Sequence, residues 1–154
     1  MLKNIATIIL VAGATVLLVW AIEKKSVATE VSTTADSSVI SKTGIHYHPK
    51  LDIYIKGQLQ TIPSGLGLGT AHQPIHTHDT DHIVHLEISG LVTLDNTRLE
   101  KFFKIWGKQF NPNCIFDNCN GPSGTVKMFV NGQPNNDFEK YLMKSDDKIE
   151  IRYE

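Results

Sequence analysis

The sequence predicts an α+β domain that follows an N-terminal hydrophobic segment. Several short stretches alternate apolar and polar residues, which is the pattern of half-buried β-strands. One stretch instead repeats its apolar residues at helical spacing, which indicates a single main helix. The chain has 154 residues. Subtracting the N-terminal segment leaves about 110 residues, enough for one domain with one hydrophobic core.

An uncharged apolar run occupies residues 5–22. As a helix it would be about 27 Å long, close to the thickness of a hydrocarbon core. Lys3 precedes the run, and Trp20 lies near its far end, as interfacial aromatic residues do. We expect residues 1–25 to be a transmembrane anchor; the alternative is a signal peptide cleaved after Ala28, for which the run is long. Both alternatives place the remaining chain outside the cytoplasm, and the anchor would make the protein a single-pass protein of the cell membrane.

Residues 26–44 are rich in Ser and Thr and lack hydrophobic periodicity, so we expect a flexible tether. A histidine-rich extracytoplasmic domain is then expected at residues 45–154. The formal net charge of the chain is −1. Because no stretch of the chain concentrates Lys and Arg, we expect no nucleic-acid partner.

The domain begins with a predicted β-hairpin. Residues 51–55 alternate apolar and polar side chains, a Lys-Gly-Gln turn follows, and residues 59–62 return. A loop rich in Gly and Pro then occupies residues 63–74. A second hairpin is predicted from a strand at residues 82–88 and a returning strand at residues 91–94.

A helix is predicted at residues 99–106, ending at Gly107. A strand at residues 125–130, a helical turn at 138–142 and an alternating strand at 148–153 complete the order. This order, with the segments M-F-V-N-G-Q and D-D-K-I-E-I-R-Y, resembles the β-grasp (ubiquitin-like) arrangement. The resemblance implies a mixed sheet with one main helix, to which the first hairpin is an N-terminal addition. It implies no chemistry, because a fold does not fix a function.

Unusual chemistry is concentrated in two histidine clusters. One is His46-Tyr47-His48, and the other spans residues 76–87 and holds four of the seven histidines. In extended segments the side chains at i and i+2 share a face, so each H-x-H pair can point at one ion. Imidazole suits copper and zinc. The predicted ligands are His46, His48, His76, His78 and His85, with Asp79 as a further ligand or as an acceptor that orients a histidine ring.

His85 joins this set because of its place on the following strand. Read with period two, His85 lies with Ile83 and Glu87 on the polar face, whereas His82 begins the apolar face. We therefore expect His82 to cap the edge of the core. His72 lies in the Gly-rich loop with no partner at ligand spacing, so we expect an ordinary surface residue.

Four motifs together resemble those of a group of membrane-anchored, extracytoplasmic prokaryotic proteins. They are H-Y-H at residues 46–48, H-T-H-D at 76–79, V-H-L-E at 84–87, where the group has I-H-x-E, and F-F-K-I-W-G at 102–107. In that group a small residue stands where this chain has His82, so the resemblance does not support His82 as a ligand. The resemblance implies metal handling and no particular reaction.

Cys114 and Cys119 are the only cysteines and flank four residues in an Asn-rich loop. Outside the cytoplasm a disulfide is the default state of such a pair, and a metal site would need a C-x-x-C motif or a second pair. Beyond Met1 the chain has only Met128 and Met143. Because Cu(I) prefers sulfur ligands, the expected ion is Cu(II) or Zn(II).

Three functions fit these features. The first is a metal-binding protein that acts outside the cell membrane as a carrier, buffer or sensor for copper or zinc, with any protein partner in the membrane or cell envelope. The second is a zinc- or copper-dependent enzyme, in which three histidines leave a position open for water and Glu87 or Asp79 acts as the base. The third is a tethered protein-interaction module with surface histidines. The sequence favours the first, because neither H-E-x-x-H nor G-x-S-x-G is present.

Overall fold

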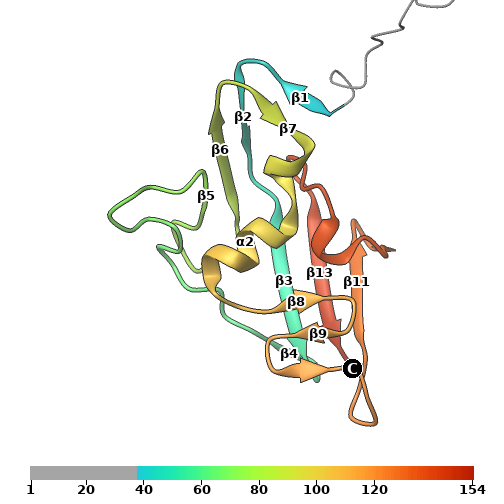
Figure 1. Ribbon diagram of the computed structural model, residues 1–154. Coiled ribbons are helices and arrows are strands. Elements are labelled where there is room, and N and C mark those ends of the chain that lie inside the picture. The colour runs from blue at the N-terminus through green and yellow to red at the C-terminus, as the bar shows by residue number, and fades with distance from the viewer. Residues whose placement is uncertain (1–37) are drawn as a thin grey trace, which may run out of the picture. The chain divides into compact units, whose positions relative to one another are not determined.

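Figure 1 shows a computed structural model of the protein, which describes residues 38–154. The predicted anchor at residues 1–25 lies outside this range. Within residues 38–154 no helix has the length and apolar character needed to cross a bilayer. The described chain is mostly β-structure with one α-helix, which confirms the predicted α+β class.

The secondary structure consists of short strands, two 3-10 turns (η) and the helix. In chain order these are β1 (Val39–Ser41), β2 (Gly44–Tyr47), β3 (Lys50–Ile55), β4 (Gln58–Leu59), β5 (Ile75–His76), β6 (His85–Ser89), β7 (Val92–Thr93), η1 (Leu94–Thr97), α2 (Leu99–Trp106), β8 (Phe110–Asn111), β9 (Cys114–Ile115), β10 (Asn118–Cys119), β11 (Val126–Val130), β12 (Gln133–Pro134), η2 (Phe138–Lys140) and β13 (Lys148–Tyr153).

The largest sheet has five strands in the order β12-β11-β13-β3-β4. Its central strand β13 runs parallel to β3 and antiparallel to β11. The predicted alternation is present: β3 buries Leu51 and Ile53, and β13 buries Ile149, Ile151 and Tyr153. These side chains form one face of the hydrophobic core.

Helix α2 supplies core residues opposite this sheet and occupies the residues that the sequence predicts. Leu99, Phe102 and Phe103 are buried at helical spacing. The helix ends at Gly107, whose φ of 68° is left-handed. The N–H groups of Gly107 and of the next residue donate to the carbonyls of Lys104 and Phe103, which satisfies the last turn. Helix α2 also packs against β5, which leads directly into the histidine cluster.

One predicted hairpin is confirmed in a different place, and the other is wrong. Strands β3 and β4 pair as the sequence predicts, but they form one edge of the main sheet and are not an addition to it. The sequence also predicts residues 82–88 and 91–94 as a hairpin, whereas β6 pairs with β2 and β5, and β7 pairs with β1. Alternation identifies residues that fit a pleated surface, but the partner strand depends on long-range packing.

Strand β1 lies inside residues 26–44, the range that the sequence assigns to the tether. Its three residues are half-buried and pair with β7. The apolar residues Val39 and Ile40 interrupt the Ser/Thr-rich composition there and explain the difference. The folded domain therefore begins upstream of residue 45.

Strands β8, β9 and β10 form a separate small antiparallel sheet. Cys114 on β9 lies directly opposite Cys119 on β10, and the two residues form the predicted disulfide. Such a bond is typical of oxidising compartments, so it favours a location outside the cytoplasm.

Candidate metal centre

The candidate site lies on the three-stranded sheet β2-β6-β5. In this sheet His46 on β2 is directly opposite Glu87 on β6, and His76 on β5 is directly opposite His85 on β6. Opposed residues on antiparallel strands project to the same face with Cβ atoms about 4.5–5.5 Å apart. His85 and Glu87 also share that face, because they are two residues apart. Strand pairing therefore gathers four polar side chains on one face.

His76 and His78 are held in place by the residue between them. Thr77 is fully buried and points to the opposite side of the chain. Its hydroxyl donates to the carbonyl oxygen of Pro63 at 2.7 Å and accepts a bond from the Leu66 N–H at 3.1 Å. These bonds fix the segment in an orientation in which both flanking histidines face the site.

Two glycines allow the backbone to pass close to the site strands. Gly67 has a φ of +78°, and a Cβ there would lie 2.7 Å from the carbonyl oxygen of Ile75. Gly44, at the start of β2, has a φ of +111°, and a Cβ there would lie 2.5 Å from the carbonyl oxygen of Ile88. Any larger residue at either position would strain the backbone and displace a site strand.

The potential ligand atoms form two groups, and within each group all atoms lie within 4.8 Å of one another. The downstream group is His76, His78, His85 and Glu87, and the upstream group is His46, His48 and His85. His85 belongs to both groups. All five histidines predicted as ligands are therefore brought together in one cluster.

Each H-x-H pair has the spacing expected of two ligands on one ion. The Nε2 atoms of His46 and His48 lie 3.1 Å apart, and so do those of His76 and His78. Two nitrogens each about 2.05 Å from an ion are this far apart when the angle at the ion is about 98°. That angle lies between those of square-planar and tetrahedral coordination, so both pairs suit copper or zinc.

His76 is prepared for binding by a backbone contact. Its side chain is fully buried, and Nδ1 lies 3.0 Å from the carbonyl oxygen of Gln73. A carbonyl can only accept, so Nδ1 carries the proton and Nε2 keeps its lone pair for an ion. Burial is the main cause that lowers the pKa of His76, which keeps the imidazole neutral at neutral pH.

The other charged groups support the same ionisation pattern. Burial and the neighbouring His78 and His48 lower the pKa of His85. For Glu87, partial desolvation raises the pKa, but the attraction of His76, His46 and other histidines outweighs it, so the pKa lies below its ordinary value. The lowered pKa values of His76 and His85 favour their neutral imidazoles, and the lowered pKa of Glu87 favours its carboxylate, which are the forms that bind a divalent cation.

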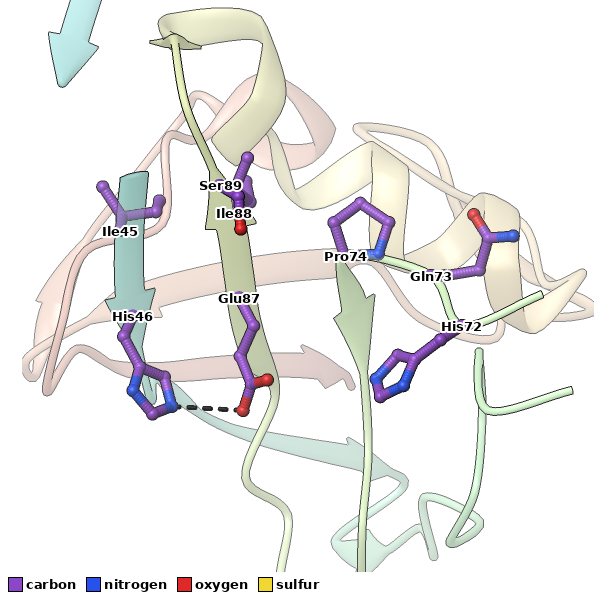
Figure 2. A pocket seen from close by; sticks show the side chains of 8 residues that line it. All are labelled: Ile45, His46, His72, Gln73, Pro74, Glu87, Ile88 and Ser89. Carbon is purple, nitrogen blue, oxygen red and sulfur yellow. Dashed lines mark ion pairs between the residues drawn. The ribbon is translucent and has the colours of Figure 1, made fainter. Parts of the chain in front are cut away.

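A cleft of about 400 Å³ opens beside the upstream group. Figure 2 shows His46 and Glu87 on neighbouring strands along one wall, with His72 on the segment that leads into β5. His46 Nε2 lies 3.1 Å from Glu87 Oε1. His46 and Glu87 thus face the cleft, where a small ligand can reach them.

Asp79, His82 and His72 lie near the cluster but belong to neither ligand group. Asp79 is exposed. His82 has a φ of 67°, and its Nδ1 lies 3.0 Å from Asp52 Oδ1 on β3, as an ion pair without the alignment of a hydrogen bond. His72 is exposed, as predicted, but its ring centroid lies 4.5 Å from that of His76, so it borders the site.

Glu87 is a potential ligand that the sequence analysis does not predict. The sequence pattern assigns the carboxylate role to Asp79 and indicates Glu87 only as a possible base of an enzyme. The pattern that identifies Glu87 is its position two residues after His85 on the polar face of one strand.

No protein-family model, curated protein or solved structure matches this chain. Fold and site together define an α+β domain with a disulfide and a histidine cluster able to hold a metal ion.

Proposed function

We propose that this chain is a membrane-anchored, extracytoplasmic protein that binds Cu(II) or Zn(II) as a carrier, buffer or sensor. The observation that carries the proposal is the pair of 3.1 Å Nε2–Nε2 distances, one in each H-x-H pair, on either side of His85. Without a metal, each pair can share one N–H···N hydrogen bond, and with a metal both nitrogens can direct their lone pairs at the same ion. Two such pairs beside a third shared histidine are the arrangement that a histidine metal site requires.

The available ligand atoms favour Cu(II) or Zn(II) over Cu(I). Both cysteines are in the disulfide, and Met128 and Met143 are buried in the core. The sulfur ligands that Cu(I) prefers are therefore committed elsewhere in the described domain, whereas imidazole and carboxylate groups gather in the cluster.

The topology supports a β-grasp-like fold, although with a different first hairpin from the one that the sequence suggests. Hairpins β3–β4 and β11–β12 flank the central β13, β3 is parallel to β13, and α2 lies between the hairpins in sequence.

We also infer the anchor at residues 1–25 and the relationship to the membrane-anchored prokaryotic group. In intact cells or spheroplasts, added protease should digest the domain; a domain that stays protected while a known surface protein is digested would contradict this orientation.

A metalloenzyme is the second candidate, and the cleft favours it. Glu87 lines the cleft as an ionised carboxylate beside the cluster, where it could take a proton from a metal-bound water. A catalytic role predicts that the zinc-loaded protein hydrolyses an activated ester and that Glu87→Gln abolishes this turnover while zinc stays bound. A carrier, buffer or sensor predicts no turnover above that of free zinc.

The test of metal binding uses the full-length protein purified without a histidine tag. Elemental analysis identifies the bound metal, and competition with a chelator of known affinity gives the dissociation constants for copper and zinc. The double variant His46→Ala, His48→Ala and the single variant His76→Ala should bind more weakly, because each removes ligand nitrogens. Asp79→Asn is the matched control and should bind like the parent, since Asp79 belongs to neither group. Parent-like affinity in all the histidine variants would exclude the site.

A further inference from the structure

We propose that the cluster is a dinuclear centre that holds two divalent ions, one on each H-x-H pair, with Glu87 between them. This inference rests on the proposed metal-binding function and adds the number of ions and their arrangement. The downstream ion has His76 and His78 as its own ligands, and the upstream ion has His46 and His48.

The number of ligands and their spacing argue for two ions. A zinc ion in a protein takes four ligands, whereas the cluster offers five imidazoles and a carboxylate. Ligand atoms bound to one ion at about 2.1 Å lie within about 4.2 Å of one another. The two pairs instead fall into separate groups, each compact within 4.8 Å, and meet only through His85. Each pair by itself already has the 3.1 Å spacing of two ligands on one ion.

Glu87 is placed to serve both ions. Its Oε1 lies 3.1 Å from His46 Nε2 and 3.9 Å from His76 Nε2, one nitrogen from each group. Two divalent cations close together repel strongly, and a carboxylate between them offsets part of that repulsion. A spacing of about 3.5–4 Å is usual for protein two-metal sites.

His85 belongs to both ligand groups and can bind either ion. Its Nδ1 is buried and has no hydrogen-bond partner among the described residues, in contrast to Nδ1 of His76, which donates to a carbonyl. The His85 ring centroid lies 4.8 Å from that of His48 and 4.5 Å from that of His78. The ring is thus within reach of both ions, and an ion supplies the partner that a buried polar atom otherwise lacks.

The two positions differ in exposure, which predicts unequal affinities. The downstream ion would sit against fully buried His76, whereas the His46 side chain of the upstream group is 63 % exposed and lines the cleft. Water and competing ligands therefore reach the upstream ion more easily. We expect the downstream position to fill first and the upstream ion to exchange faster.

The experiment is a titration of the full-length, untagged protein with Cu(II). Calorimetry and elemental analysis give the number of ions bound, and electron paramagnetic resonance shows whether the bound ions are magnetically coupled. The first equivalent should give the spectrum of an isolated Cu(II). The second should replace it with the broadened spectrum of two magnetically coupled ions about 4 Å apart. His48→Ala should bind one equivalent instead of two and show no coupling. Asp79→Asn should match the parent, and circular dichroism checks that both variants are folded.

Each outcome has a distinct meaning. A parent protein that binds one equivalent contradicts the dinuclear centre and leaves the proposed function standing. Two equivalents without coupling mean separate sites and also overturn the inference. Failure to bind copper or zinc at all overturns both proposals. Should His48→Ala not fold, His46→Gln removes an exposed ligand of the same ion and decides the question in its place, again with one uncoupled equivalent expected.

Discussion

Replacing Thr77 by Val should loosen the segment that positions His76 and His78. Val has nearly the shape of Thr but lacks the hydroxyl that bonds to Pro63 and Leu66. Because Thr77 is fully buried, both backbone partners lose a hydrogen bond in a place that water cannot easily reach. Leaving a buried group unsatisfied costs about 1–3 kcal/mol. We expect a loss of about 2 kcal/mol in the free energy of unfolding and a fall in Tm of about 8 °C for a domain of this size.

The assay is urea unfolding of the metal-free protein, followed by a metal-competition titration at a temperature where the variant is folded. Because the histidines lose their alignment, metal affinity should also fall, by about tenfold. Thr77→Ser is the matched control: it keeps the hydroxyl, loses one methyl group worth about 0.8 kcal/mol, and should keep parent-like affinity. If Thr77→Val proves as stable as the parent and binds metal as tightly, the hydroxyl does not organise the site.

Three further predictions concern pH, the disulfide and the metal-free state. Burial lowers the pKa of His76 and His85 in the folded domain, so these histidines take up protons at a higher pH in the unfolded chain than in the folded one. Urea unfolding should therefore show that the metal-free domain is less stable at pH 5 than at pH 7.5. Metal affinity should fall over the same pH range, because protons compete with the ion for the imidazoles. Reduction of the disulfide between Cys114 and Cys119 should lower the free energy of unfolding by about 2 kcal/mol. Two free thiols in unreduced, freshly isolated protein would show that the disulfide does not form in the cell. Protein treated with a chelator should keep its circular dichroism spectrum, and metal at one hundred times its Kd should add about 2.7 kcal/mol of stability; loss of secondary structure would instead indicate a structural metal.

The sequence predicts the elements of this fold better than their partners. Helix α2 and strand β13 lie where periodicity places them, because long amphipathic patterns reflect which face is buried. The partners of β6 could not be predicted, because residues 89–90 read as a turn signal and nothing local shows that β2 and β5 lie on either side. Strand β1 could not be predicted, because its three residues are too few to show an alternating pattern.

The same distinction applies to the site. The two H-x-H pairs could be identified because their spacing places both side chains on one face of an extended segment, independent of the fold. His85 could be added because alternation along its strand places it on the polar face. The choice between Asp79 and Glu87 depends on strand register: Glu87 lies directly across from His46 only because β2 pairs with β6 in this alignment. The approach of His72 to His76 likewise depends on the path of a loop that carries no periodic pattern.

Strand β6 explains how metal binding and folding can be separate properties of one small domain. Leu86 on β6 and Val84 just before it are fully buried in the core, whereas His85 and Glu87 point to the site from the opposite face. The core side requires no ion, since its contacts with the helix and the five-stranded sheet are apolar. The site side requires the core, because only correct strand register opposes His76 to His85 and His46 to Glu87. The arrangement of the ligands should therefore depend on the fold, whereas the fold should not depend on the ligands. Substitutions in the core should disturb the ligands, and substitutions of exposed ligands such as His46 should leave the fold intact.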